Sequence, residues 1–87
     1  MYPIVYKRWA MEPADWRKRE KLTLRGLAKK LGCTAMTVSR YETGEREAPN
    51  SIVLAYGRVT KGEVTAEDLH RVRKRYLRAE EGDSAAA

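Results

Sequence analysis

Apolar residues between Leu24 and Leu31 recur at the 3.6-residue spacing of a helix that buries one face. Thr23 stands directly before this segment, where its hydroxyl can accept a hydrogen bond from a backbone N–H of the first turn. Gly32 stands directly after it, and glycine adopts the left-handed conformation that ends a helix at little steric cost. The pattern therefore predicts a capped helix over residues 24–31.

A second capped helix is predicted over residues 35–43. Thr34 is its N-cap, Val38 and Tyr41 face inward at helical spacing, and Gly44 ends it. A short turn containing a glycine separates the two helices. Two short helices joined in this way form the helix-turn-helix layout, in which the second helix enters the major groove of DNA.

Two further helices flank this pair. A proline suits the first helical position, so Pro13 predicts a helix that runs to about Glu20. Ser51 is expected to cap another helix, in which apolar residues repeat at helical spacing as far as Val59. Together with the central pair, these segments predict an all-α protein.

A fifth helix is predicted from a weaker capping box, Thr65 with Asp68, to about Glu80. One of its faces is apolar, at Leu69, Val72 and Tyr76. Three interpretations stay open. The apolar stripe packs on its own core beside a solvated basic face, or it joins two subunits, or the arginines bind flanking phosphates. The basic residues of this helix are Arg71, Arg73, Lys74, Arg75 and Arg78.

These segments predict a small bundle of four to five helices with the following organisation. Residues 1–12 form an N-terminal extended arm or short edge strand, because the first nine are rich in β-branched and aromatic residues. Residues 13–65 form the helix-turn-helix domain, residues 66–80 the C-terminal basic helix, and residues 81–87 a disordered tail of small polar residues.

The arm has two open interpretations. Lys7 and Arg8 lie beside Tyr6 and Trp9, so the arm could reach the minor groove or the flanking backbone of DNA. Alternatively, the aromatic side chains pack against a neighbouring helix, either in the same chain or by exchange between two subunits.

Length and charge narrow the classes of function. The chain has 87 residues, enough for one small domain and too few for a separate catalytic domain. Eighteen Lys and Arg against twelve Asp and Glu give a net charge of +6, which suits a polyanionic partner. No apolar run is long enough for a membrane span, and no signal-peptide pattern opens the chain. The single cysteine, Cys33, has no intramolecular disulfide partner, which favours a packed thiol in a reducing cytoplasm.

The residues also argue against an enzyme or a metal protein. His70 is the only histidine, and with one cysteine it cannot form a four-ligand structural zinc site. Neither a catalytic triad nor a glycine-rich phosphate loop is present in the sequence. We therefore expect no catalytic residues, no metal, no cofactor, no small-molecule substrate and no membrane partner.

The motifs L-T-x-x-x-L-A-x-x-L-G at residues 22–32 and T-x-x-T-V-S-R-Y-E-x-G at residues 34–44 resemble the Cro/C1-type (XRE-like) helix-turn-helix family of phage and bacterial repressors. The resemblance covers residues 15–69, and residues 59–69 look like the segment after the fourth helix in prophage Cro-like regulators. It implies a lambda-repressor-like bundle that binds double-stranded DNA as a homodimer.

By resemblance, the base-contacting positions on the second helix of the motif are Ala35, Met36, Ser39 and Arg40. The first two are apolar where well-known family members have glutamine, so they can touch a thymine methyl group but form no bidentate hydrogen bond. Arg40 is the main candidate for a specific contact, since its planar guanidinium matches the O6 and N7 atoms of guanine.

The resemblance also implies contacts to DNA phosphates, at Thr37 and Thr43 and at the start of the preceding helix, where Thr23 caps free N–H groups. Leu24 replaces the glutamine that clamps a phosphate in the family, and Arg25 is the candidate to take over that contact.

Arg17 and Glu42 occupy positions that form a structural ion pair in the family, which would tie the first helix to the end of the third. The sequence as a whole thus predicts a dimeric, sequence-specific transcriptional regulator, a repressor of phage type. A different class is also open, namely a protein-interaction module such as an antitoxin or an adaptor on the same fold.

Overall fold

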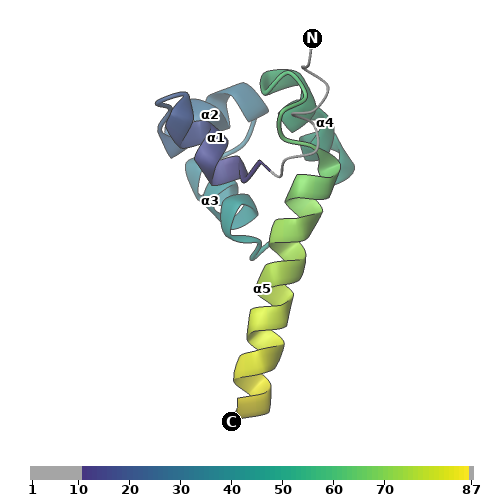
Figure 1. Cartoon of the computed structure of the whole chain (residues 1–87). Coiled ribbons are helices and arrows are strands. Elements are labelled where there is room, and N and C mark those ends of the chain that lie inside the picture. The colour runs from purple at the N-terminus through teal and green to yellow at the C-terminus, as the bar shows by residue number, and fades with distance from the viewer. Residues whose placement is uncertain (1–10, 87) are drawn as a thin grey trace.

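The computed structural model describes residues 11–86, with side chains as far as residue 81. This part of the chain is all-α, as predicted, with α1 (Pro13–Arg19), α2 (Leu24–Leu31), α3 (Ala35–Thr43), α4 (Asn50–Val59) and α5 (Ala66–Ala86). The first four helices gather around the N-terminal half of α5, and the C-terminal half of α5 projects beyond them (Figure 1). The predicted arm lies almost wholly outside the described residues.

The core forms where the inward faces of all five helices meet. Leu27 and Ala28 of α2 pack with Val38 and Tyr41 of α3, and Tyr56 of α4 is completely buried. Full burial of one large apolar side chain is worth about 1.5–3 kcal/mol, so these residues supply most of the driving force for folding. The core also contains Trp16, Leu31, Ala55, Val64, Leu69 and Val72.

The predicted caps of α2 and α3 are confirmed. Thr23 Oγ1 accepts from the backbone N–H of Gly26 at 3.0 Å, and Thr34 Oγ1 accepts from that of Thr37 at 3.2 Å. Gly32 and Gly44 end the two helices with φ values of +82° and +89°. The three-residue turn 32–34 therefore holds α2 and α3 in contact.

The predicted capping box at the start of α5 is confirmed. The backbone N–H of Thr65 donates to the Asp68 carboxylate at 3.0 Å, and the backbone N–H of Asp68 donates to the Thr65 hydroxyl at 3.3 Å. The carboxylate also accepts from Arg71 at 2.8 Å and from the backbone N–H of Met11 at 3.3 Å. Burial by itself would raise the pKa of Asp68, but these hydrogen bonds outweigh it and lower the pKa.

We expect this network to make the fold sensitive to acid. Because the pKa of Asp68 is lowered on folding, its contribution to stability is present above the unfolded-state pKa, about 3.9, and is lost as the pH falls below that value. The variant Asp68→Asn should therefore lose about 1–2 kcal/mol at pH 7. Urea denaturation at pH 7 and pH 2 measures both values, and a deficit that is equally large at pH 2 would contradict the assignment.

Two helix ends differ from the prediction. Ser51 is not the N-cap of α4: the helix begins at Asn50, and the N-cap is Pro49, which makes no side-chain cap hydrogen bond. The ring of Pro49 fixes φ near the value found here, −69°, and its carbonyl accepts the N–H groups of Ile52 and Val53. Ser51 is thereby moved into the first turn.

The end of α5 is the second difference. The helix continues to Ala86, past the predicted boundary at Glu80. Once a helix is established, each added residue needs only a favourable propensity, and residues 79–86 contain three alanines and no proline. A single Gly82 is too weak a signal to stop it.

The described helices include none that is long and apolar enough to cross a membrane. Cys33 is half-buried in the turn between α2 and α3, and this burial raises the pKa of its thiol.

Candidate nucleic-acid interface

One face of α3 is open to solvent. Val38 and Tyr41 are buried on the opposite side of the helix, whereas Met36 is 63% exposed and Thr43 is also exposed. Met36, Arg40 and Thr43 follow one another at i, i+4 and i+7, so they form a single row along the helix. No other helix of residues 11–86 covers this row, which leaves α3 accessible to a groove.

Arg40 lies in the middle of the row with a guanidinium that is available for binding. Its side chain is 37% exposed, and its nearest carboxylate oxygen is Glu45 Oε2, 3.9 Å from Nε. That separation is too long for a hydrogen bond, and an exposed pair of this kind contributes only about 0–1 kcal/mol. The guanidinium can therefore leave Glu45 for a stronger partner at little energetic cost.

The other predicted base-contacting residues flank Arg40. Met36 is exposed, whereas Ala35 and Ser39 are half-buried at the edge of the same face. The methionine and the alanine offer only apolar contact, which suits the methyl group of thymine. Among the predicted base-contacting residues, only Arg40 and, with a shorter reach, Ser39 have side chains that can form hydrogen bonds.

The predicted phosphate-contacting threonines differ in their free hydrogen-bonding capacity. Thr23 uses one lone pair for the backbone N–H of Gly26, which leaves its hydroxyl hydrogen for a phosphate oxygen. Thr37 shares a hydrogen bond with the hydroxyl of Thr34 at 2.8 Å, so the pair keeps one hydroxyl hydrogen to donate. The hydroxyl of Thr43 donates to the Arg40 carbonyl at 3.2 Å and accepts from the Glu45 N–H at 3.3 Å. Thr43 would have to give up its donor bond in order to reach a phosphate.

The first turn of α2 offers a second place for a phosphate. Arg25 is exposed there, directly after Leu24, which is half-buried and packs against the core. The backbone N–H groups at the start of a helix have no partner within the helix, and the helix dipole favours an anion beside them. Arg25 and these N–H groups can therefore replace the side-chain clamp that leucine cannot provide.

Arg17 and Glu42 join α1 to α3 behind the exposed face. Nε of Arg17 donates to Oε2 of Glu42 at 2.6 Å, and Nη2 donates to Oε1 at 3.1 Å. Nη1 donates to the carbonyl of Leu22 at 3.0 Å, so the guanidinium also fixes the approach to α2. The side chains are only 15% and 7% exposed, and the pKa of Arg17 is raised, chiefly by its hydrogen bonds to Glu42.

Arg73 of α5 holds the C-terminal end of α3 in place, a role that the sequence pattern did not reveal. Its Nη1 donates to the carbonyl oxygens of Gly44 at 2.9 Å and of Glu45 at 2.8 Å. Gly44 itself lies against the backbone of Val72. Arg73 was predicted only as part of a basic face, but its guanidinium is used inside the chain, and α5 thereby sets the position of α3.

The apolar stripe of α5 serves the same purpose. Leu69 and Val72 are buried in the core of their own chain, and Tyr76 is half-buried beside them. Helix α5 contacts both α3 and α4 through this part of its length. Of the three interpretations of this helix, packing on its own core therefore holds for Leu69 and Val72.

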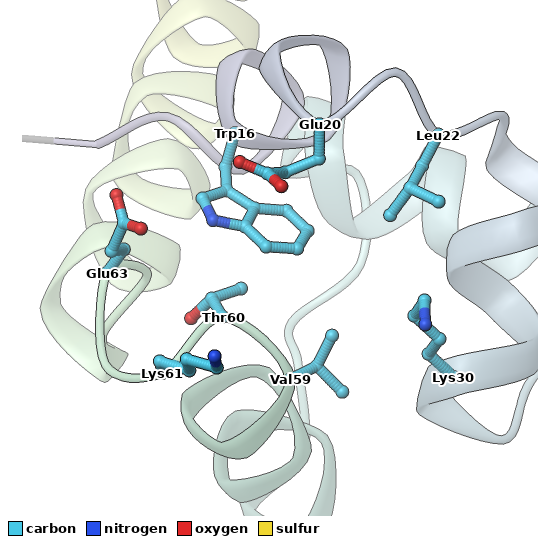
Figure 2. A pocket seen from close by; sticks show the side chains of 8 residues that line it. All are labelled: Trp16, Glu20, Leu22, Lys30, Val59, Thr60, Lys61 and Glu63. Carbon is cyan, nitrogen blue, oxygen red and sulfur yellow. The ribbon is translucent and has the colours of Figure 1, made fainter.

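A hollow of about 450 Å³ lies between α1, the start and end of α2, and the turn after α4. Figure 2 shows the ring of Trp16 on one side of it, Val59 and Thr60 on the other, and the two lysines Lys30 and Lys61 at its margins. No residue of α3 lines this hollow. It is separate from the face that would meet DNA.

Two capped helices joined by a three-residue turn, with the second helix exposed along one face, define a helix-turn-helix protein. The chain belongs to the helix-turn-helix domain family, whose model matches residues 14–72. No curated protein and no solved structure gives a significant match. Membership of this family, which is typically non-enzymatic, indicates a DNA-binding regulator.

Proposed function

We propose that the protein is a sequence-specific transcriptional regulator of the Cro/C1 type that reads the major groove of double-stranded DNA with α3. The observation that carries this proposal is the open row Met36, Arg40 and Thr43 on a helix whose opposite face is fixed in the core. The ion pair of Arg17 at one side and the clamp by Arg73 at the other keep this helix rigid. A rigid, exposed α-helix fits the major groove, which is wide enough to admit one.

Affinity and specificity come from different residues in this proposal. The net charge of +6 supplies salt-dependent attraction through the release of counterions from the phosphates. Base readout comes from Arg40 to guanine and from Ala35 and Met36 to thymine methyl groups. Thr23, Arg25 and the hydroxyl pair Thr34–Thr37 orient the protein on the backbone, whereas Thr43 is less suited to that role.

Two copies are needed for useful specificity, because one short helix contacts few base pairs. We propose a cytoplasmic homodimer that binds a palindromic site, with half-sites about 34 Å apart, one turn of DNA. Occupation of such a site beside a promoter would block transcription, as expected of a phage-type repressor.

The variant Arg40→Ala is expected to lose about 1–3 kcal/mol of binding to the preferred sequence, because a bidentate guanine contact is removed. Binding to random DNA should change little, since most phosphate contacts persist. The preferred sequence is first selected from a random duplex pool, and fluorescence anisotropy then measures both affinities.

Arg78→Ala serves as the matched control, since it removes the same charge from an exposed site on α5. It should leave the ratio of the two affinities unchanged. Equal loss on both DNAs for Arg40→Ala would rule out a base contact by this residue.

The exposure of Met36 supports a second candidate, a protein-interaction module such as an antitoxin or an adaptor. A flexible methionine at the centre of an exposed helix face also suits a protein partner. Selection from the random pool separates the two functions, because an interaction module enriches no sequence.

A further inference from the structure

The outward face of α4 combines an exposed leucine with small neighbours. Leu54 is 61% exposed, although Ala55 and Tyr56 beside it are buried. At 100° per residue, Ser51 and Gly57 lie on either side of Leu54 on the same face. A leucine between two small residues forms a knob with a shallow notch at each end.

Nothing within the chain explains why residue 57 is a glycine. It lies in the middle of α4, where glycine is less favourable than alanine by about 1 kcal/mol. A Cβ atom built at this position meets nothing within 4 Å, so neither packing nor a left-handed backbone requires glycine. Glycine within a helix permits another backbone to approach closely, and the space beside Gly57 is open to the outside.

Charges at the two ends of α4 are opposite in sign. Glu47 precedes α4, whereas Arg58 and Lys61 lie at and beyond its C-terminal end, and all three are exposed. None of their side chains takes part in an ion pair within the described residues. A two-fold axis through Leu54 would place a second α4 antiparallel to the first, with residue 47 opposite residue 61.

We propose that this α4 face, formed by Asn50, Ser51, Leu54, Gly57 and Arg58, joins two copies of the chain as an antiparallel helix pair. The two Leu54 side chains pack against each other at the axis, each Ser51 lies opposite Gly57 of the other copy, and Glu47 faces Lys61 at both ends. The surface is self-complementary, as a two-fold interface requires. This inference rests on the proposed function, because the α4 pair supplies the dimer that a regulator of this type needs.

The other apolar stripe of the chain does not provide an equivalent surface. Leu69 and Val72 of α5 are already buried in their own core, so they have no apolar area left for a second copy. A single helix pair buries less area than a stable dimer, whose interfaces bury about 1,200–2,000 Å². Without DNA, the association is therefore expected to be weak.

Sedimentation equilibrium of the full chain without DNA, from 5 µM to 1 mM, tests the proposal. The wild type is expected to show a concentration-dependent monomer–dimer equilibrium. Leu54→Glu and Gly57→Leu should each weaken dimerisation about 10-fold or more, the first by placing two carboxylates at the axis and the second by filling the notch. Leu77→Glu is the matched control, because Leu77 is also exposed but lies on α5. Circular dichroism checks that each variant is folded.

Charge reversal provides the more specific test. Glu47→Lys and Lys61→Glu should each weaken dimerisation about 3- to 10-fold, because each creates two like-charge contacts across the axis. The double variant exchanges the charges and should recover the affinity of the wild type. A generally destabilising effect on the fold would instead accumulate in the double variant.

Several results would overturn the inference. A monomer at 1 mM, or a dimer that Leu77→Glu dissociates and Leu54→Glu does not, excludes the α4 face. These measurements use no DNA, so they are independent of the Arg40→Ala test. If the protein is a monomer whose DNA binding depends on Arg40, only the α4 pairing is refuted. If it dimerises through α4 but shows no sequence preference, only the proposed regulator is refuted.

Discussion

Arg17→Ala is expected to lower the free energy of unfolding by about 3–5 kcal/mol, because it leaves a buried carboxylate without its cation. Glu42 is only 7% exposed, and Arg17 supplies both of the hydrogen bonds that its oxygens receive from side chains. The same substitution removes the bond to the Leu22 carbonyl between α1 and α2. Urea denaturation followed by circular dichroism at pH 7 measures the loss.

Two variants show whether the uncompensated charge is the cause. Lys18→Ala, at an exposed neighbour on α1, should change stability by less than about 0.5 kcal/mol. The double variant Arg17→Met with Glu42→Leu removes both charges and should recover most of the loss. DNA binding by Arg17→Ala should fall on all sequences together, since the fold and not the readout is affected. An unchanged melting temperature would contradict this account.

Features that depend on a few neighbouring residues could be predicted from the sequence. The caps Thr23 and Thr34 and the helix-ending glycines act within one turn of the chain, so their residue types fix the bounds of α2 and α3. The capping box at the start of α5 is equally local. In each case the side chain and the backbone group that it satisfies lie no more than four residues apart.

Contacts between distant parts of the chain could not be predicted in the same way. Arg73 binds carbonyl groups 28 and 29 residues earlier, and nothing in the local pattern distinguishes it from the other arginines of α5. For Ser51 the local pattern was misleading. Serine is a good capping residue, but Ser51 lies two positions after Pro49, which already starts the helix. Steric restriction by Pro49 outweighs the preference of serine for the N-cap.

The candidate interface also has features that the sequence predicts and features that only the structure shows. The exposure of Met36 and Arg40 follows from helical periodicity, because Val38 and Tyr41 fix the opposite side of α3. The hydroxyl of Thr43 points to the same region, but its donor bond to the Arg40 carbonyl depends on geometry at the helix end. Sequence alone therefore places residues on the face, while the structure decides which of their hydrogen-bonding groups are free.

Gly44→Ala is expected to lower the free energy of unfolding by about 2–5 kcal/mol, as the sum of two effects. The residue has φ of +89°, where a side chain adds strain of about 1–2 kcal/mol. In addition, a Cβ atom would lie 2.5 Å from the carbonyl oxygen of Val72 and 3.0 Å from the Cβ of Tyr76. Both are parts of α5 that cannot rotate away, so α3 and α5 must separate, with overpacking of about 1–3 kcal/mol.

Gly32→Ala isolates the first effect, the backbone strain. Gly32 ends α2 with nearly the same φ, +82°, but a Cβ atom there would meet nothing within 4 Å. Its substitution should therefore show only the backbone strain, about 1–2 kcal/mol. The difference between the two variants in urea denaturation measures how tightly the end of α3 is held against α5. If both variants lose the same stability, the close approach of Gly44 to Val72 does not hold α3 in position, and the clamp by Arg73 must do so alone.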